Sequence, residues 1–481
     1  MNYYVTTSIP YVNGEPHLGH AMEFVMADVL ARYARQQGTP VIFSTGTDEH
    51  GGKIAEKATE LKITPKAFSD KVSEQFKVLA KQLNISNDRF IRTTDPGHEQ
   101  RAQIIWKNLE KDIYKGQYVG WYCTGDEAFF PEATVKANNG ICPAHNRPYE
   151  KIEEENYFFK LTKYAPQIQK AIESEAFRVV PKTRKHEILS VIKEGLEDIS
   201  ISRPKDKIEW GIPVPGDTKQ VMYVWFEALM NYITVLGYPE HEDFKQFWPA
   251  NVQVIGKDIL RFHAAIWPGM LLGLGLPLPK QLYVHGFITV DDKKMSKSLG
   301  NSVAPSEIIK KYSADALRYY ILRHIPSYED GDFTWDKLEA AYNNELANEL
   351  GNAVQRTLAM VMKYQNGIIG DIPAAQHDTA QYREALENCH FDRALDEVWE
   401  QVRGLNQYID EEKPWELAKN KEADHLQEVL AYQVGMLLEI AELLEPFTPE
   451  TALKIKHAFH EGVIRPMKET LFPKEEKSAA A

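Results

Sequence analysis

The chain has 481 residues, of which 43% are apolar and 26% are charged, and its formal net charge is −13. This length exceeds what one hydrophobic core can organise, so about three or four domains are expected. The acidic excess excludes a uniformly basic nucleic-acid coat, but it is compatible with a large partner bound at a local basic face. Three cysteines exclude a disulfide-rich scaffold and fit a reducing cytoplasm.

The N-terminal third alternates strand and helix. Residues 3–9 are β-branched and aromatic, 11–20 are rich in turn formers, and 41–48 read as a second strand. Between them, a helix that stops at Gly38 is predicted by apolar residues at helical spacing: Met22, Val25, Met26, Val29, Leu30 and Tyr33. A βαβ unit of this kind predicts a parallel sheet that binds ligands at the carboxyl ends of its strands.

A second strand–helix alternation lies far downstream. Strands are predicted at 220–225, 251–256 and 281–290, with helices after the first two. The segment between the two halves, 113–210, is rich in loops and contains a Cys/His pair. We expect it to be an insertion into a split nucleotide-binding domain. No stretch is long and apolar enough to span a membrane, and the run at 266–279 is broken by Pro and Gly.

From about residue 338 the sequence is helical. Apolar rows at helical spacing predict a bundle with short connections. The rows are Leu346, Leu350, Val354 and Leu358, then Phe391, Leu395, Val398, Val402 and Leu405, then Leu426, Val429, Leu430, Leu437, Ile440 and Leu444.

Two motifs carry the chemistry. "HLGH" (17–20) stands at the turn from the first strand into the first helix, where a helix N-terminus and two imidazoles can bind phosphate. "KMSKS" (294–298) follows the strand at 281–290 and offers the point charges of Lys294 and Lys297 in a loop. Alone, "HLGH" could be a turn that happens to hold two histidines, and "KMSKS" could be a solvated basic loop. The presence of one motif after the first strand and the other after the last strand is far more specific than either motif alone.

With these motifs in place, the chain resembles the class I aminoacyl-tRNA synthetases, and among them the methionyl-tRNA synthetase family. Further stretches in the family's order are "TTSIPYVNGEPHLGH", "TGTDEHGGKI", "DISISRP", "YVWFEALMNY", "VIGKDILRFHAAIWP" and "VHGFITVDDKKMSKSLGN". The resemblance runs from Tyr3 to about Phe472. It implies a cytoplasmic, ATP-dependent enzyme that joins L-methionine to tRNA(Met) through an aminoacyl adenylate, with Mg²⁺ accompanying the ATP. Partners would be initiator and elongator tRNA(Met), with no membrane, and a monomer is the default.

The resemblance assigns roles around ATP. His17, Gly19 and His20 would contact the phosphates, while Lys294 and Lys297 would stabilise the reacting phosphorus centre. Asp258 would hold the ribose hydroxyls, and the backbone around Gly286 would meet the adenine.

A methionine site needs a carboxylate for the ammonium group and polarizable walls for the thioether. Asp48, at a strand's carboxyl end, fits the first role, although a helix-capping aspartate would look the same. The family match favours the ligand role, with Arg203 as charge partner. The matched wall residues are Ile9, Tyr11, Trp225, Ala228, Tyr232, Ile259 and His263. Leu229 stands where the family commonly has proline, which leaves its effect on the pocket open.

An apolar pocket discriminates close isosteres by only roughly 10- to 200-fold, so some relatives add a large editing insertion. The insertion of about a hundred residues expected here is too small for one. This favours the methionine enzyme over a leucine, isoleucine or valine enzyme. The intact HLGH motif, Asp48 and KMSKS motif disfavour a non-catalytic RNA-binding relative, because a binding module has no need of them.

The resemblance places Asn352, Arg356 and Trp415 at anticodon-reading positions. Single-stranded bases are recognised by stacking and by hydrogen bonds to their edges, which these side chains can supply. A polar helix face and a core tryptophan are the structural alternatives.

Cys123, Cys142 and His145 match ligand positions of a zinc knuckle, and Asp126 occupies the fourth position. A carboxylate is a harder ligand than a thiolate, so weaker zinc binding is expected. A metal-free loop that keeps these residues for packing remains the alternative.

The predicted fold class is therefore α/β: a split Rossmann-like parallel-sheet catalytic domain with a knuckle-type insertion, followed by an α-helical bundle that binds the anticodon. The expected boundaries are 1–112 and 211–291 for the two catalytic halves, 113–210 for the insertion, 292–337 for the KMSKS loop and stem-contact region, 338–472 for the bundle and 473–481 for a disordered tail.

Overall fold

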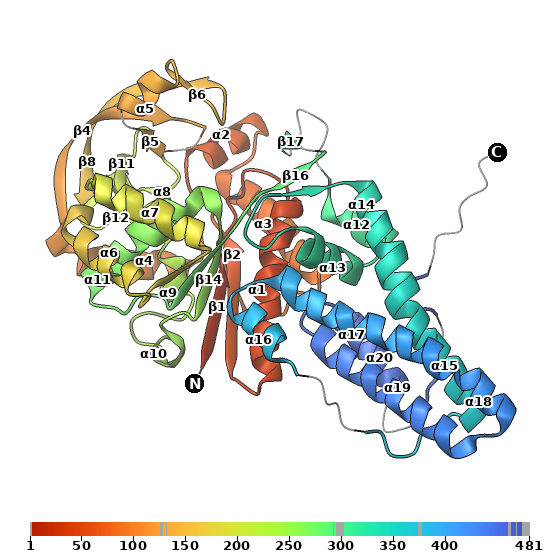
Figure 1. Cartoon of the computed structure of the whole chain (residues 1–481). Coiled ribbons are helices and arrows are strands. Elements are labelled where there is room, and N and C mark those ends of the chain that lie inside the picture. The colour runs from red at the N-terminus through yellow and green to blue at the C-terminus, as the bar shows by residue number, and fades with distance from the viewer. Residues whose placement is uncertain are drawn as a thin grey trace, which may run out of the picture. The chain divides into compact units, whose positions relative to one another are not determined.

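The computed structural model describes residues 2–125, 128–130, 132–291, 293–294, 303–373, 378–459, 463–467 and 469–473. The chain divides into two compact units. Unit 1 comprises Met1–Pro16, Thr39–Val78 and Asn87–Val284, and unit 2 comprises His17–Gly38, Leu79–Ser86 and His285–Ala481. Figure 1 labels the helices and strands of both units.

A six-stranded sheet forms the centre of unit 1, with the order β3-β2-β1-β14-β15-β9. Its strands are β1 (Tyr3–Thr7), β2 (Val41–Thr47), β3 (Arg89–Arg92), β9 (Arg178–Val180), β14 (Val252–Gly256) and β15 (Gln281–His285). The pairs β1·β2, β2·β3, β1·β14 and β9·β15 are parallel. The predicted parallel sheet and the two separated halves that build it are confirmed.

Close packing of β2 against β3 explains one glycine of the sheet. A Cβ atom added to Gly46 would lie 2.1 Å from the backbone oxygen of Ile91, across the strand pair. No side chain fits there, so glycine is required by the approach of the neighbouring backbone.

Helices and short turns of unit 1 bury the sheet's apolar residues. They are α2 (Gly52–Glu60), α3 (Pro65–Gln82, which continues into unit 2), α4 (Pro96–Asn108), α6 (Ala165–Glu173), α7 (Lys182–Glu194), α8 (Val224–Ala228), α9 (Asn231–Thr234), α10 (Glu242–Phe247) and α11 (Trp267–Leu274). The largest fully buried side chains of this core include Tyr4, Tyr232, Trp267 and Phe159. A π-helical turn, Phe262–Ile266, precedes α11.

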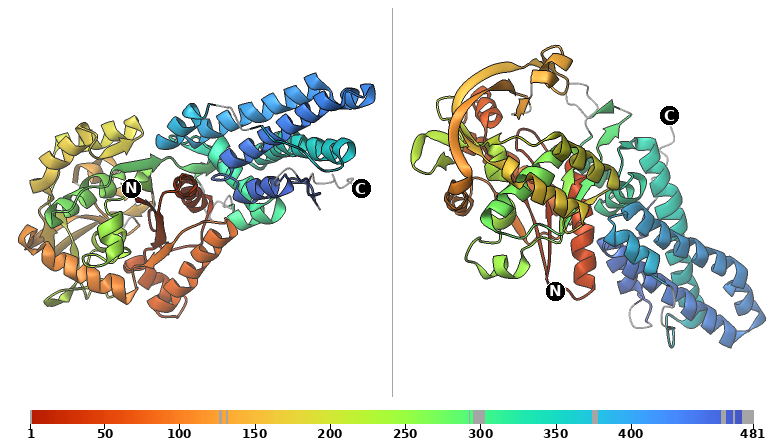
Figure 2. Two further views of the ribbon diagram at one scale, coloured as in Figure 1. Left: turned by 90° about the horizontal axis from the view of Figure 1, so that it is seen from below. Right: turned by 60° about the vertical axis from the view of Figure 1, so that its left-hand side comes forward.

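Smaller sheets occupy the stretch expected to be an insertion. β4 (Ile113–Cys123), β5 (Ala128–Phe130), β8 (Glu150–Phe159) and β10 (Ile199–Ser200) form one sheet. α5 (Glu132–Ala137) and the pair β6 (Ile141–Cys142) and β7 (Arg147–Pro148) follow β5 in the chain. β4 and β8 pair antiparallel over most of their length and form the long orange ribbon of Figure 2.

Three sequence-based expectations differ from the structure. Strand β9 lies within 113–210, yet it forms the edge of the central sheet. The strand expected at 220–225 belongs to β13 (Asp217–Met222), which pairs antiparallel with β11 (Ser202–Pro204) and β12 (Pro213–Val214). The single strand expected at 281–290 is two strands, because the chain leaves the sheet at Gly286. Short apolar runs do not specify their pairing partner, which is why the sequence could not distinguish these cases.

Unit 2 contains α1 (Leu18–Gln36), a small sheet and the helical bundle. The sheet has the order β17-β16-β18, with β16 (Ile288–Val290), β17 (Lys293–Lys294) and β18 (Gly331–Phe333). α12 (Pro305–Lys311), α13 (Ala314–His324) and α14 (Trp335–Ala341) follow, then a π-helical stretch, Tyr342–Gly351. The bundle has α15 (Asn352–Gln365), α16 (Ala380–Glu387), α17 (Phe391–Glu412), α18 (Pro414–Asn420), α19 (Ala423–Leu444) and α20 (Pro449–Ala458).

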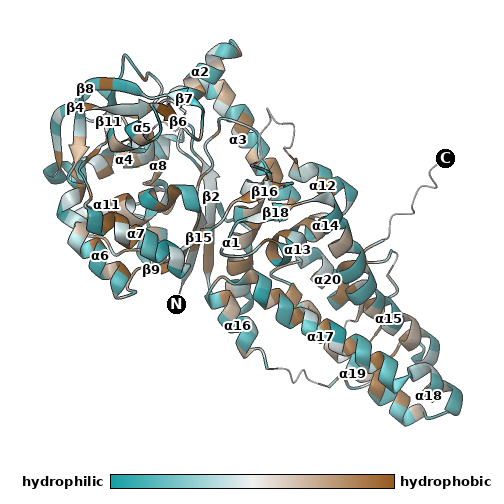
Figure 3. Cartoon of the chain, turned by 45° about the horizontal axis from the view of Figure 1, so that its top comes forward, coloured by the Kyte–Doolittle hydropathy of each residue, from teal (hydrophilic) through white to brown (hydrophobic). Residues whose placement is uncertain are grey.

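The bundle confirms the predicted apolar rows. Every residue of the three rows is buried. In Figure 3, α17 and α19 carry brown apolar patches next to teal polar ones, as expected for helices that are buried on one side. Among the described residues, no helix has the length and apolar character needed to cross a membrane. The predicted disordered tail, apart from Pro473, lies outside the described residues.

Candidate functional site

A small pocket lies at the carboxyl ends of β1 and β2 in unit 1. Loop and helix residues that follow the strands of the sheet line it: Ser8, Ile9, Asp48, Trp225, Ala228, Leu229, Asn231, Tyr232, Ile259 and His263. Its position is the one that parallel α/β sheets use for ligands. One carboxylate stands among largely apolar and aromatic walls, so the pocket suits a small ligand with a cationic group and an apolar side chain.

Asp48 is held by the backbone of the β1–α1 connection. Its N–H donates to the carbonyl of Pro10 at 2.8 Å, and its carbonyl accepts from the N–H of Val12 at 3.0 Å. The residue is 5% exposed. The structure therefore fixes a buried carboxylate at the pocket, and the cap position of the following helix α2 is Gly51 and not Asp48.

The far wall of the pocket contains a polar pair with a defined orientation. Nδ1 of His263 lies 3.0 Å from the carbonyl of Ile259, which can only accept, so this nitrogen bears the hydrogen. In a neutral ring, Nε2 then accepts from the hydroxyl of Tyr232, 2.7 Å away. Beside them, the ring of Trp225 stacks on Phe262 with centroids 4.0 Å apart.

Most of the residues predicted to bind methionine meet in this one pocket. Those that line it are Ile9, Asp48, Trp225, Ala228, Tyr232, Ile259 and His263. Tyr11 lies next to them, in a β-bridge with Asp48. The sequence missed Ser8 and Asn231, whose neighbours in the chain are the signal that could have found them. Leu229, noted as a departure from the family, also lines the pocket.

Arg203 lines a different hollow. Its guanidinium donates to Glu154 at 3.0 and 3.3 Å and lies over the ring of Tyr122, with 4.4 Å to the centroid. Tyr122, Glu154 and Lys207 line that hollow with it. Glu154 therefore balances the charge of Arg203, whose expected partner was Asp48. A methionine-binding role for Arg203 stays a prediction.

The two histidines of "HLGH" cap α1 reciprocally. Nδ1 of His17 accepts from the N–H of Gly19 at 3.1 Å, and Nδ1 of His20 accepts from the N–H of His17 at 3.2 Å. Since both Nδ1 atoms accept, a neutral ring bears its hydrogen on Nε2. Burial and the neighbouring His17 hold the pKa of His20 well below its usual range. His20 is thus held uncharged, and the two rings together offer hydrogen-bond donors at a helix N-terminus, which suits phosphate oxygens.

Other predicted ATP residues lie in or near the ends of strands. Asp258 is exposed, in the short 3₁₀ turn that follows β14. Gly286 passes so close to the backbone of Glu329 that an added Cβ would lie 2.2 Å from its oxygen. Lys294 ends β17, while Lys297 lies outside the described residues.

The predicted anticodon residues come from two helices of the bundle. Asn352 is exposed at the start of α15, and Arg356 follows one turn later. The guanidinium of Arg356 donates to Asp410 at 2.7 Å and lies over the ring of Trp415, 5.7 Å from its centroid. Trp415 is 38% exposed. The tryptophan is thus not a core residue, and an arginine and an aromatic ring share one surface.

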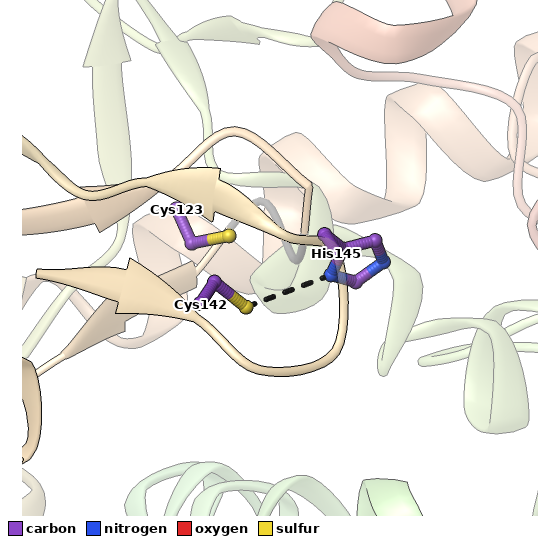
Figure 4. Close-up of side chains that lie close together, drawn as sticks. All are labelled: Cys123, Cys142 and His145. Atoms are coloured by element: carbon purple, nitrogen blue, oxygen red, sulfur yellow. Dashed lines mark hydrogen bonds between the residues drawn. The ribbon is translucent and has the colours of Figure 1, made fainter. Parts of the chain in front are cut away.

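Cys123, Cys142 and His145 converge, as Figure 4 shows. Their ligand atoms lie within 4.8 Å of one another, and Sγ of Cys142 is 3.8 Å from Nδ1 of His145. Gly125 permits this approach, because an added Cβ would lie 2.4 Å from Cγ of His145. Two thiols and an imidazole form a donor set that suits zinc. Asp126, the predicted fourth ligand, lies outside the described residues.

The sequence of this chain is similar to those of known proteins over most of its length. The family model described as "tRNA synthetases class I (M)" matches residues 3–151 and 138–358. A methionine–tRNA ligase of Caldanaerobacter subterraneus is 43% identical over 94% of this chain and 73% of its own length. That of Thermotoga maritima is 41% identical over 95% of this chain and 75% of its own length.

A solved structure is similar over almost the whole chain. It is Mycobacterium tuberculosis methionyl-tRNA synthetase in complex with methionyl-adenylate, at a TM-score of 0.93 and 35% identity, covering 98% of this chain and all (100%) of that one. The free form of the same enzyme has a TM-score of 0.86 at 32% identity, covering 99% of this chain and 98% of that one.

Proposed function

Because the chain belongs to the methionyl-tRNA synthetases of class I, we propose that it joins L-methionine to tRNA(Met) at the expense of ATP. The reaction passes through methionyl adenylate and releases AMP and pyrophosphate. Methionyl-tRNA(Met) serves translation initiation and elongation, so initiator and elongator tRNA(Met) are both substrates.

The observation that carries this function is the pocket around Asp48. Its carboxylate binds the ammonium group of methionine, and the rings of Trp225, Tyr232 and His263 surround the thioether. Sulfur is polarizable and interacts favourably with aromatic rings, which selects methionine over a purely aliphatic side chain. Ile9, Ala228 and Ile259 complete the apolar wall. Tyr11 borders the pocket beside Asp48. Arg203, which lines a separate hollow with Glu154, is proposed to assist methionine binding from there.

Adenylate formation requires little covalent chemistry from the protein. The carboxylate of methionine attacks the α-phosphorus of ATP, the bond to the bridging oxygen breaks, and that oxygen leaves as part of pyrophosphate. Nε2–H groups of His17 and His20 donate to phosphate oxygens, and the ammonium groups of Lys294 and Lys297 neutralise the developing charge. Asp258 binds the ribose hydroxyls, and the backbone at Gly286 binds adenine. Mg²⁺ accompanies the ATP phosphates and screens their charge.

Single-turnover adenylate formation tests this assignment. We expect His20→Ala to slow adenylate formation by about 10²- to 10³-fold, the usual cost of removing one donor to a developing charge. Lys297→Ala is expected to act in the same direction. Methionine binding, measured by calorimetry without ATP, is expected to stay unchanged. Normal rates in both variants would overturn the phosphate assignment while leaving the methionine site standing.

Zinc is proposed as a structural ion at Cys123, Cys142 and His145, with Asp126 as the fourth ligand. The convergence of the first three ligands supports it. We expect near-stoichiometric zinc in the purified protein and loss of zinc from Asp126→Ala. Retention of zinc by the variant would mean a different fourth ligand, and metal-free wild type would overturn the site.

The bundle is proposed to read the anticodon through Asn352, Arg356 and Trp415. Stacking on an exposed ring and hydrogen bonds to base edges are the means by which single-stranded bases are recognised. We propose that the domains with these roles have the boundaries expected from the sequence: 1–112, 113–210, 211–291, 292–337 and 338–472. We further propose that the enzyme is a cytoplasmic monomer.

A further inference from the structure

A buried carboxylate lies on α8, the helix from which Trp225 and Ala228 line the Asp48 pocket. The segment from Trp225 to Tyr232 supplies half of the pocket's lining residues, and Glu227 lies in the middle of that segment without lining the pocket. Its side chain has no exposure to solvent. Burying an ionised carboxylate is costly unless it is paired and hydrogen-bonded, so its partners indicate what it holds in place.

Both carboxylate oxygens of Glu227 accept from histidines. Oε1 lies 2.8 Å from Nδ1 of His50, and Oε2 lies 2.9 Å from Nε2 of His98. The other ring nitrogen of His98 is 2.8 Å from the hydroxyl of Thr234, on helix α9. All four side chains are at least nine-tenths buried. One carboxylate therefore joins α8 and α9 to α4 and to the end of β2.

The partners of Glu227 connect the two walls of the pocket. His50 follows the ligand Asp48 by two residues, whereas Glu227 stands between Trp225 and Ala228. The Glu227–His50 contact thus links the segment that carries Asp48 to the helix that carries Trp225 and Ala228. Burial disfavours a charge on the His50 ring, but the charge and hydrogen bond of Glu227, with help from Glu99 and Asp48, raise its pKa to about 10. An ion pair of this kind is a rigid spacer in a low-dielectric interior.

We propose that Glu227 is a positioning residue of the methionine site, which fixes the wall of α8 and α9 against Asp48 through His50 and His98. The proposal rests on the proposed function of the pocket. It predicts that loss of Glu227 weakens methionine recognition selectively. ATP binding through the "HLGH" motif does not depend on this contact.

Steady-state ATP–pyrophosphate exchange of Glu227→Gln tests the proposal. Glutamine keeps the shape but loses the charge and turns an N–H₂ group toward one imidazole N–H. We expect the KM for methionine to rise by about tenfold or more, which corresponds to a loss of about 1.4 kcal/mol of binding free energy. The KM for ATP stays within about twofold, because no ATP contact changes. Discrimination against norleucine, which replaces the sulfur by a methylene, falls as the wall loosens.

A matched control separates positioning from general loss of negative charge. Glu99 is 43% exposed and lies 3.7 Å from Nε2 of the same His50. We expect Glu99→Gln to change no KM by more than about twofold, since exposed charge pairs contribute little. The double variant His50→Gln with Glu227→Gln is expected to have nearly the same KM for methionine as either single variant. Both changes remove the same contact, the one between His50 and Glu227. Additive effects would contradict the proposal.

Further outcomes are distinguishable. If Glu227→Gln does not fold, His98→Asn, which leaves the Glu227–His50 pair intact, must show the same split between the two KM values. An unchanged methionine KM in a folded Glu227→Gln variant, or an equal rise in both KM values, would overturn the positioning role. Wild-type protein that shows no methionine-dependent exchange would instead overturn the proposed function of the pocket.

Discussion

Three consecutive polar residues at the end of β2 enter three different environments. Asp48 lines the pocket, while Glu49 receives two hydrogen bonds from Arg92, each of 2.7 Å. His50 turns toward Glu227. Strand residues alternate sides, and the chain leaves the strand just here, so neighbouring side chains reach separate partners. These three residues therefore combine one group that lines the pocket with two that hold the strand end in place.

The His50–Glu227 pair makes stability depend on pH. The pKa of His50 is raised from 6.5 to about 10 in the folded protein, so the pair contributes its full stability below pH 6.5. That contribution is lost as the pH rises through about 10. We expect His50→Gln to lower the melting temperature more at pH 6 than at pH 10, measured by calorimetry. Glu99→Gln serves as the comparison, and an equal deficit of His50→Gln at both pH values would contradict the raised pKa.

Two glycines are predicted to respond oppositely to alanine. Gly46→Ala places a Cβ against the backbone of Ile91, and we expect a destabilisation of about 1–3 kcal/mol, the usual cost of overpacking. Gly404 lies on the exposed face of α17 with no atom within 4 Å of an added Cβ. Gly404→Ala should stabilise the helix by about 0.5–1 kcal/mol. Thermal unfolding of both variants checks the pair, and a stabilised Gly46→Ala would show that β2 and β3 can separate.

At the scale of elements, helix α1 shows how a local motif acquires two roles. His17 and His20 satisfy backbone N–H groups of the first turn with their Nδ1 atoms, which orients both rings with Nε2–H as the remaining donor. Capping residues are usually Ser, Thr, Asp or Asn. Histidines in this position therefore combine a structural cap with a donor set.

Elements also mark the limit of what the sequence could predict. The first strands, α1 and the bundle helices were predictable because their apolar spacing is local. The role of Glu227 was not, because its partner His98 is 129 positions away and only the fold brings them together. The same holds for β9, whose three residues carry no sign of which sheet they join. Most pocket residues were predictable only through the family resemblance, since single aromatic residues in separate segments have no spacing signal of their own.

On the surface of the bundle, Trp415 is expected to act on tRNA and not on adenylation. Stacking of one base is worth about 1–3 kcal/mol, so Trp415→Ala should lower kcat/KM for tRNA(Met) by roughly 5- to 150-fold. ATP–pyrophosphate exchange without tRNA should stay unchanged. Tyr432 is a matched control, because it is 37% exposed on α19 but lies in a groove with Glu397, Glu400 and Glu411, whose charges repel phosphates. Equal losses in both variants would argue against base stacking at Trp415.

At the scale of the whole molecule, the two units contain the residues proposed for different parts of the reaction. The Asp48 pocket, proposed to bind methionine, lies in unit 1, and the "HLGH" motif and the bundle lie in unit 2. A net charge of −13 leaves nucleic-acid binding to local surfaces such as that of Arg356 and Trp415. Composition alone therefore gave no indication of a tRNA substrate, whereas the ordered motifs and the fold both did.

The central claim is that the Asp48 pocket selects methionine for adenylation. Amino-acid-dependent ATP–pyrophosphate exchange across a panel that contains methionine, leucine, isoleucine, valine and norleucine tests it most directly. We predict that methionine gives the highest kcat/KM, and that Asp48→Asn abolishes most of this exchange while the protein stays folded. Absence of exchange with methionine, or a higher kcat/KM with leucine, would contradict the account.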